Sequence, residues 1–451
     1  MGQQIEKLAA FVAKTQWEDV PEPVQKHAKL VFLDTFGVIL AGSVRPEVEQ
    51  MRERLAPSAG SGASVYARGC PTHDPRTAAL LNGIAGRSIE LCEGLRLVSG
   101  QAAVQVLPGV LAVGEAASAT GRDAITALIL GYEVAGRLCA AFTARPLAHQ
   151  NGQASLLGAA AGGARVRNMS AADVSRAMRI STMLLLTPSY TNAVAGATAL
   201  NVAGGMSGYV GALAPELALA GFEAQDDAIE EALGKLVGEE FRPEKVNDEL
   251  GTRWDITRNY FRLYACCNPI HPALDSLQAV LTELRPRPED IDRIDIATYR
   301  FASVMRNPDP PNYFASKYSL SHAAAVMVVK GEAGHGAIDD AALRDPAVAA
   351  LRPRVHVTED AAMSAVAPRL RPARVTVTLK DGHTGTHACE SHRGDFNDPF
   401  AESELREKFR ELSAQVLTSE GVARIEEMVG RCEEWTSVRE LAEAVRRHAR
   451  S

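Results

Sequence analysis

The sequence predicts a mainly α-helical fold, in which a large all-helical domain carries a smaller inserted α+β domain. Composition is the first reason: the chain of 451 residues is rich in Ala, contains 36 Gly, and has only 5% aromatic residues. Small residues at this density suit closely packed helices better than a β-sandwich. The second reason is the spacing of apolar residues, which is helical to about residue 280 and then changes. Length alone suggests two or three domains.

The helical part is predicted from a succession of apolar segments. Residues 24–42 and 75–87 place apolar side chains at helical spacing, and a helix with a wide apolar face follows from Asp123. No alternating segment is found before about residue 280. From Ala401 the sequence is again amphipathic and highly charged, so the C-terminal helices are expected to return to the helical domain.

The inserted part is predicted from alternating segments. Residues 291–299 and 374–379 alternate between apolar and polar side chains, which indicates half-buried strands. The second segment leads into Asp381-Gly382, a dipeptide typical of a hairpin turn. Helices are predicted between these strands at 319–330 and 339–350.

One long segment, residues 180–215, contains no charged side chain and is long enough to span a bilayer. It also contains several Ser, Thr and Asn residues, two prolines and many glycines. A spanning helix would be more continuously apolar. We therefore predict buried central helices in this segment and no membrane partner.

Charge and cysteine content exclude several other classes of protein. The 48 basic and 55 acidic residues give a net charge of -7, which argues against a nucleic-acid partner because phosphate binding needs a concentrated basic surface. The seven cysteines are scattered, and no zinc or iron–sulfur ligand pattern appears, so no metal site is predicted. The N-terminal segment has no signal-peptide core, and a cytoplasmic location is expected.

Eight segments together, spread from about residue 5 to 440, resemble the MmgE/PrpD family. Their order and spacing are more specific than any one of them. The segments are LDTFGVILAGS (33–43), NGIAGRSIELCEG (82–94), VLPGVLAVGEAASATG (106–121), GYEVAGRL (131–138), LAGFEA (219–224), YFRLYACCNPIHPALDSL (260–277), KYSLSHAAA (317–325) and HRGDFNDPFAESELREKFREL (392–412).

The resemblance implies an organisation and a chemistry. It implies a helical domain made of residues 1–267 and 396–451, an α+β lid domain of residues 268–395, a cleft between the two, and a homodimer. Family activities include 2-methylcitrate dehydratase, cis-aconitate decarboxylase and iminodisuccinate epimerase, so a small organic acid is the implied substrate. No metal, flavin, nicotinamide or other cofactor is implied. The implied reaction is proton abstraction next to a carboxylate, followed by loss of water or carbon dioxide, or by reprotonation.

The catalytic residues that the resemblance implies are only partly present. The family's acidic loop position falls at Glu90, with Glu93 nearby, and its second histidine at His149. Its first histidine position is occupied by Gln101, which cannot take up a proton near pH 7. A lysine expected in the glycine-rich region is replaced by Leu200.

Further candidates for substrate binding follow along the chain. The lysine position near the lid junction falls at Arg262, which keeps the positive charge but not the acid–base capacity. Each candidate has a structural alternative: a glutamate in a solvated loop, a histidine or cysteine packed in the core, an arginine in an ordinary ion pair. The candidates for substrate binding are Gln101, Asn151, Arg262, Cys267, His271, Lys317 and Tyr318.

Two hypotheses follow. The first is a cofactor-independent lyase or isomerase in which His149 transfers the proton, Glu90 or Glu93 orients it or acts as partner acid, and Arg262 holds an anionic group. Because Leu200 removes a cation, the substrate is expected to be less anionic than 2-methylcitrate or cis-aconitate. The second is a non-catalytic family member that uses the inherited cleft to bind a small acid or a protein. Dehydration, decarboxylation and epimerisation stay open.

Overall fold

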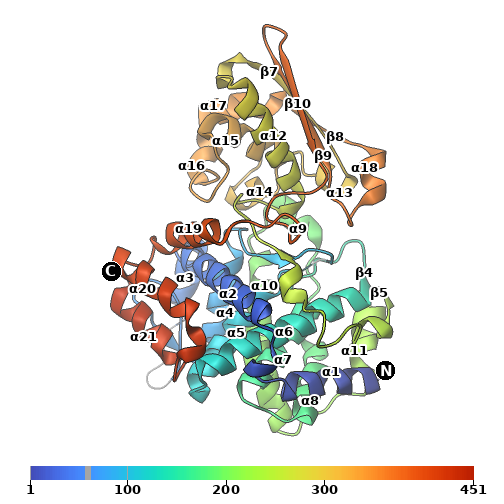
Figure 1. Cartoon of the computed structure of the whole chain (residues 1–451), viewed down its shortest axis with the longest axis vertical. Helices are drawn as coiled ribbons and strands as arrows, with labels where there is room; N and C mark the ends of the chain where they lie inside the picture. Colours follow the sequence, from blue (N-terminus) through green and yellow to red (C-terminus); the bar gives the residue numbers. More distant parts are fainter. Residues whose placement is uncertain (1, 56–61, 99, 451) are drawn as a thin grey trace.

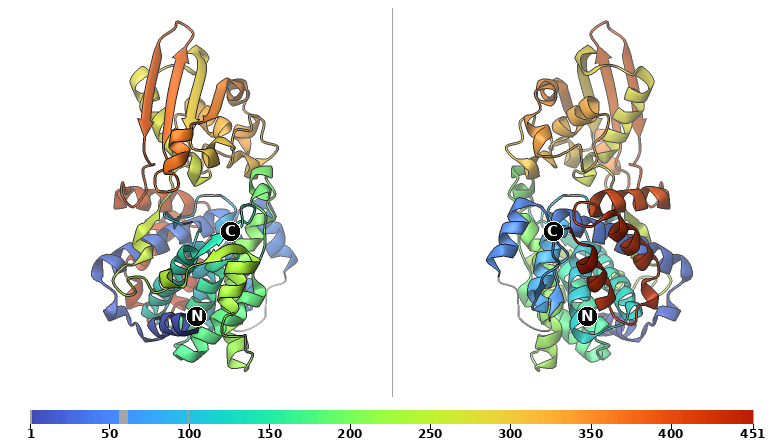
Figure 2. Two further views of the ribbon diagram at one scale, coloured as in Figure 1. Left: turned by 90° about the vertical axis from the view of Figure 1, so that its right-hand side faces the viewer. Right: turned by 90° about the vertical axis from the view of Figure 1, so that its left-hand side faces the viewer.

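The computed structural model describes residues 2–55, 62–98 and 100–450, and it confirms the predicted mainly helical fold. Figure 1 shows a lower body of packed helices and, above it, a smaller part that contains the principal sheet. Both termini lie in the lower body (Figures 1 and 2). Its helices are α1 (Gly2–Lys14), α2 (Glu22–Gly42), α3 (Pro46–Arg54), α4 (Pro75–Arg87), α5 (Ala103–Ala117), α6 (Gly121–Ala141), α7 (Ala154–Val166), α8 (Ala171–Ser181), α9 (Tyr190–Ala195), α10 (Leu200–Leu219), α11 (Ala228–Glu231), α19 (Glu402–Ser413), α20 (Ser419–Gly430) and α21 (Arg439–His448).

The centre of the lower body is built from α4, α5, α7 and α10: α10 packs against the other three, and α5 also packs against α4 and α7. Glycines allow these helices to approach closely. A Cβ atom at Gly163 would lie 1.9 Å from the carbonyl oxygen of Gly211, and one at Gly83 would lie 2.7 Å from the Cα of Gly205. No side chain fits at either contact, which gives the high glycine content a structural reason.

The upper part holds a four-stranded sheet in the order β10-β9-β7-β8. The two predicted strands are present, and the predicted hairpin joins β9 to β10 in antiparallel register. Helix α12 packs on β9 and β10, and α15 packs against α12 and β8. The elements are β7 (Ile291–Thr298), β8 (Val355–Glu359), β9 (Ala373–Leu379), β10 (Thr384–Cys389), α12 (His271–Leu284), α13 (Arg300–Ser303), α14 (Tyr313–Ser316), α15 (Leu320–Lys330), α16 (Asp340–Arg344), α17 (Pro346–Leu351) and α18 (Ala361–Val366).

The structure corrects the sequence predictions in three places. The helix expected at 339–350 is two short helices, because Asp345 caps α17 and Pro346 occupies its first turn. Strand β8, which pairs in parallel with β7, was not predicted. Short strand pairs also interrupt the first 280 residues, which were expected to be helical throughout. These are β1 (Ala63–Ser64) with β2 (Thr72–His73), β3 (Gly94–Leu95) with β6 (Asn259–Tyr260), and β4 (Phe142–Ala144) with β5 (Gly238–Phe241).

The uncharged segment 180–215 is not one continuous helix. It begins at the end of α8, passes through α9 and covers most of α10, whose inner face is buried. Within the described residues a different single helix, α6, is long and apolar enough to cross a membrane, but 94% of its most apolar window is buried inside the protein. Neighbouring helices therefore cover its apolar side chains, as in the core of a globular domain.

A buried ion pair fastens the C-terminal helices to the N-terminal ones. Lys408 in α19 donates from Nζ to Asp34 Oδ1 of α2 at 2.5 Å and to the carbonyl of Leu91 at 2.9 Å. Both charged side chains are almost fully buried. Burial raises the pKa of Asp34, and Lys408 opposes that rise.

We expect Lys408→Met to lower the free energy of unfolding by about 3 kcal/mol at pH 7, because it leaves the Asp34 carboxylate buried and unpaired. The penalty shrinks in acid, since a carboxyl group whose pKa is raised in the folded state favours folding at low pH and loses that benefit as the pH rises through its folded pKa. Urea denaturation at several pH values measures this. Lys26→Met, which removes the exposed Lys26–Glu22 pair, is the control and should cost little. An equal loss in the two variants would contradict the prediction.

Candidate active site

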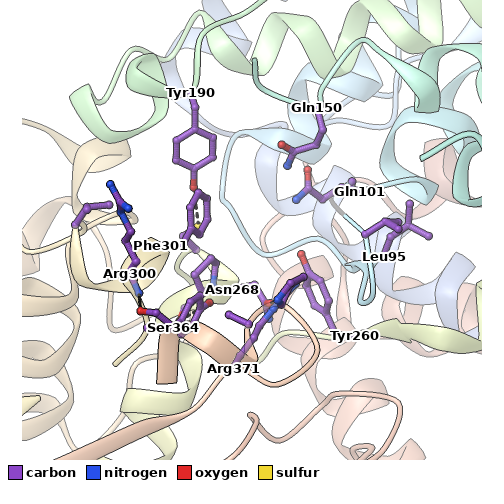
Figure 3. Close-up of a pocket in the computed structure, with 18 of the residues that line it drawn as sticks. Leu95, Gln101, Gln150, Tyr190, Tyr260, Asn268, Arg300, Phe301, Ser364 and Arg371 are labelled. Atoms are coloured by element: carbon purple, nitrogen blue, oxygen red, sulfur yellow. Dashed lines mark hydrogen bonds between the residues drawn. The ribbon is translucent and has the colours of Figure 1, made fainter. Parts of the chain in front are cut away.

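A cavity of about 520 Å³ lies between the segments of the lower body and those of the sheet-containing part. Figure 3 shows Leu95, Gln101 and Gln150 on one side of this pocket and Tyr190, Phe301 and Arg300 on the other. Most of the lining side chains are apolar or aromatic, with a few polar groups among them. This is the usual composition of a small-molecule site.

Glu90 lines the pocket between two arginines. Arg87, the last residue of α4, donates to Glu90 Oε2 at 2.7 Å, and Arg262 donates to Glu90 Oε1 at 2.7 Å. All three side chains are buried. Although burial alone would raise it, the two guanidinium groups lower the pKa of Glu90 to about 2. Glu90 is therefore a fixed anion, and the three groups together carry one net positive charge.

The backbone at Glu90 has a φ of 50°, in the left-handed region that few residues other than glycine adopt. Its carboxylate is held in both ion pairs while the backbone has this conformation. Arg262 also binds the carbonyls of Glu90, Cys92 and Cys266, so it fastens the turn after α4 to the segment before α12.

Gln101 and Cys267 also line the pocket. The Oε1 atom of Gln101 is buried and has no hydrogen-bond partner among the described residues. The Cys267 thiol lies 3.8 Å from the hydroxyl of Tyr190. Burial raises the pKa of Cys267 to about 12, so at neutral pH the thiol is a proton donor and not a nucleophile.

His149 lies directly behind the pocket wall, where its ring stacks on that of Tyr190 at 5.3 Å. Its Nδ1 atom accepts a hydrogen bond from the backbone N–H of Asn151 at 3.2 Å. Burial, reinforced by Arg87, lowers the pKa of His149 to about 3. The ring is therefore neutral near pH 7, and because Nδ1 accepts, its proton is on Nε2.

Glu93 is directed away from the pocket. Its carboxylate accepts hydrogen bonds from the hydroxyl of Tyr132 at 2.7 Å, from the backbone N–H of Ala103 at the start of α5 at 3.0 Å, and from Asn259 at 3.3 Å. Burial raises the pKa of Glu93 to about 7. Through these contacts Glu93 supports the start of α5 and the segment beneath the pocket that contains Asn259.

Three other predicted residues contact the rear of the site or lie beyond it. His271 bonds to the Cys266 carbonyl at 3.1 Å, and burial lowers its pKa far below the ordinary value. Lys317 donates to the Ile338 carbonyl at 2.6 Å, and burial lowers its pKa to about 7. Burial and then the nearby Glu90 raise the pKa of Tyr318. None of the three belongs to the pocket lining.

Sequence reasoning missed two arginines of the pocket, Arg300 and Arg371. Arg371 donates to Asn268 Oδ1 and, at 3.1 Å, to the carbonyl of Arg96, and neither Arg300 nor Arg371 pairs with a carboxylate in the described part of the chain. They are available for an anionic ligand.

Leu200, at the position where the family resemblance implied a lysine, is buried in an apolar cluster. In the same described ranges, no three His, Cys, Asp or Glu side chains gather as metal ligands would.

The chain matches two family models that together span most of its length. The model of the MmgE/PrpD N-terminal domain matches residues 6–238, and that of the MmgE/PrpD C-terminal domain matches residues 264–434. The chain belongs to the MmgE/PrpD family. This confirms the resemblance drawn from its sequence segments.

Curated relatives of this MmgE/PrpD protein are similar over almost their whole length. The cis-aconitate decarboxylase-like protein oryM of Aspergillus oryzae is 24% identical, with 98% of this chain and 96% of the relative covered. A cis-aconitate decarboxylase of Aspergillus terreus is 23% identical, with 97% and 94% covered. The human cis-aconitate decarboxylase is also 23% identical, with 95% and 92% covered. Family and relatives together support a lyase of the dehydratase or decarboxylase type.

Replacing Glu90 tests the ion-pair arrangement. Glu90→Gln leaves Arg87 and Arg262 buried without their counter-charge and is expected to lower the free energy of unfolding by about 3 kcal/mol at pH 7. The folded pKa is about 2, against an ordinary value of 4.5, so the ionised group stabilises the protein above about pH 4.5 and loses this effect as the pH falls towards 2. The difference between wild type and variant should therefore narrow in acid.

Chemical denaturation at pH 7 and pH 3 measures this difference. The control is Glu18→Gln, because Glu18 pairs with Arg122 at the exposed surface. That variant should change the free energy of unfolding by less than about 1 kcal/mol. A Glu90→Gln protein as stable as the control at pH 7 would refute the role given to the two ion pairs.

Proposed function

We propose that this MmgE/PrpD protein is a lyase that removes carbon dioxide from a small dicarboxylic acid. The observation that carries the proposal is the composition of the pocket. It offers two arginines without a carboxylate partner in the described part of the chain, the protonated donors Cys267 and Tyr190, and one glutamate, Glu90, that is held as an anion.

The first step of the argument is anion binding. Arg371 is held by Asn268 and by the Arg96 carbonyl, so its guanidinium is already oriented when substrate arrives. Arg300 stands at the exposed side of the pocket. A guanidinium fork matches the two oxygens of a carboxylate and remains charged at every physiological pH. Arg300 and Arg371 together bind one carboxylate of the substrate. With no third cation at Leu200, the pocket suits a dicarboxylate better than a tricarboxylate.

The second step concerns the reaction. Dehydration and epimerisation begin with removal of a proton by a base within reach of substrate. Glu90 is too weak a base, because two arginines stabilise its anion. Glu93 and Lys317 have pKa values near neutrality, but their polar atoms are occupied outside the pocket. The pKa values alone would select Glu93 or Lys317 as the base, but neither side chain reaches the pocket.

Decarboxylation does not require such a base. The bond between the substrate carbon and one carboxylate breaks, its electron pair passes to the neighbouring unsaturated or carbonyl system, and carbon dioxide leaves. A proton donor must then protonate the carbon. Cys267 and Tyr190 are protonated and face the pocket. The apolar lining also favours neutral carbon dioxide over the carboxylate from which it forms.

His149 has a different role here from the base suggested by the sequence. A neutral imidazole with its proton on Nε2 is a hydrogen-bond donor, and it can stabilise charge that develops in the transition state. Stacking on Tyr190 aligns the two rings.

The proposal also includes a homodimer, which is supported by the family resemblance.

The proposed reaction class can be tested with purified protein in D₂O. Unsaturated and β-carbonyl dicarboxylic acids of four to six carbons are expected to release carbon dioxide and to take up one deuterium at the new C–H bond. Substrate that has not reacted should show no exchange of its own C–H protons, because no base removes them. Headspace analysis and proton NMR measure these outcomes. Exchange without carbon dioxide release would contradict decarboxylation, and no consumption of any acid would favour the non-catalytic reading. Rapid turnover of cis-aconitate or 2-methylcitrate would contradict the preference for a less anionic substrate.

Arg371→Gln is expected to raise KM for such a substrate about 10- to 100-fold with a smaller change in kcat, because it removes a charged contact made in both ground and transition states. Arg371→Lys should restore part of the loss. Steady-state kinetics gives both constants. The control is Arg374→Gln, in which the half-exposed Arg374 of β9 loses its distant pairing with Asp360. Equal effects of Arg371→Gln and Arg374→Gln on KM would show that Arg371 does not bind the substrate.

A further inference from the structure

Three buried polar side chains at the start of α7 lack hydrogen-bond partners within the described ranges. Neither amide atom of Asn151 and neither amide atom of Gln153 is bonded, and the hydroxyl of Ser155 in the first turn is not bonded either. All three residues are 0% exposed. Buried polar groups almost always have partners, because leaving them unpaired is costly. The five unpaired polar atoms of these three side chains therefore point to a polar ligand at the start of α7.

The same place is the positive end of a helix. Helix α7 has 13 residues, no acidic side chain in its first turn and no side-chain cap. The first N–H groups of a helix have no partner within the helix, and together with the helix dipole they favour an anion. Arg87 and Glu90 both lie close enough to affect the pKa of the neighbouring His149, and the positive charge of Arg87 has the larger effect of the two.

The start of α7 lies immediately behind the pocket wall. Gln150 and Gly100 line the pocket, and a Cβ atom at Gly100 would lie 3.6 Å from Ser155 Oγ. Figure 3 shows Gln150 and Gln101 on this side of the space. The turn before the helix is fixed, because the N–H of Gly152 donates at 3.0 Å to Gln105 of α5.

We propose that the N-terminus of α7, with Asn151, Gln153 and Ser155, is an inner subsite that binds a second carboxylate of the substrate. This inference rests on the proposed function, in which Arg371 and Arg300 bind the first carboxylate at the outer end. The inner subsite consists of neutral donors: two carboxamide NH₂ groups, a hydroxyl and backbone N–H groups. Such donors bind anions at helix N-termini without a lysine or an arginine.

The test compares pairs of ligands that differ only in the second carboxylate: succinate with butyrate, and glutarate with pentanoate. Isothermal titration calorimetry on the full-length protein should show that the better-fitting dicarboxylate binds at least about tenfold more tightly than its monocarboxylate partner. Asn151→Asp adds a negative charge inside the subsite at almost constant shape. It should abolish that preference while changing the affinity for the monocarboxylate by less than about twofold, and Gln153→Glu should act in the same direction.

The matched control is Asn168→Asp. Asn168 is exposed just beyond the opposite end of the same helix, where its Oδ1 accepts from Arg165 at 2.6 Å. This variant adds the same charge and should keep the full dicarboxylate preference. If Asn151→Asp or Gln153→Glu does not fold, as judged by circular dichroism, Ser155→Ala replaces it; removal of one donor should weaken dicarboxylate binding about three- to tenfold and leave monocarboxylate binding unchanged.

Each outcome separates the inner subsite from the proposed function. Equal affinities for the paired acids in the wild type, or an unchanged preference in the Asn151 and Gln153 variants, would overturn the inner subsite while leaving the outer arginines in place. Loss of the dicarboxylate preference in Asn168→Asp would show that the preference depends on overall charge, and it would also overturn the inner subsite. Monocarboxylate binding that is insensitive to Arg371→Gln would overturn the outer site, and hence the proposed function. Binding of neither acid would overturn both.

Discussion

The buried contact of Glu90 with Arg87 and Arg262 is the interaction on which the pocket depends. Each partner comes from a different segment: Arg87 ends α4, Glu90 occupies the strained turn that follows, and Arg262 precedes α12. Because one carboxylate satisfies two guanidinium groups, removing Glu90 would leave two buried positive charges without a counter-charge. The arrangement therefore fixes the turn after α4 and leaves one excess positive charge beside the pocket.

Other buried contacts extend from this centre. Arg262 also binds the carbonyl of Cys92, and Lys408 binds that of Leu91, so the turn after α4 is held from two directions. The carboxylate of Glu93, in the same turn, accepts a hydrogen bond from the backbone N–H of Ala103 in the first turn of α5. A carboxylate suits the N-terminus of a helix. Thus the acidic turn that the sequence marked as catalytic contributes one residue to the pocket and another to its support.

Much of the fold was predictable because helical periodicity and strand alternation are local properties. Helices α2, α4 and α6, the hairpin of β9 and β10, and the charged C-terminal helices all follow from such patterns. Strand β8 was missed although Val355 and Val357 alternate with polar residues, because a pattern of only five residues is too short to stand out from a loop. The pocket depends on contacts between distant segments, which a single sequence does not encode in any local pattern.

The candidate site shows the same division. Glu90, Gln101 and Cys267 were found through motif positions, and all three line the pocket. Sequence spacing did not distinguish Glu90 from Glu93, because a left-handed turn between α4 and α5 determines which of them faces inward. Arg300 begins α13, just after β7, and Arg371 lies in the loop between α18 and β9. Neither segment has a recognisable motif, and only the folding of the chain brings the two residues to one cavity.

In the proposed reaction the substrate carries one more negative charge than the product, and this difference favours binding of substrate and release of product. A dicarboxylate enters a cavity that has Arg300 and Arg371 at its outer end and one excess positive charge beside it, so binding is favourable before any chemistry occurs. Loss of carbon dioxide followed by protonation at carbon removes one negative charge from the ligand. The product then has one carboxylate for the same set of donors, and the contacts at one end are given up. Binding is therefore weaker for product than for substrate, and release follows from the same electrostatics that favoured capture.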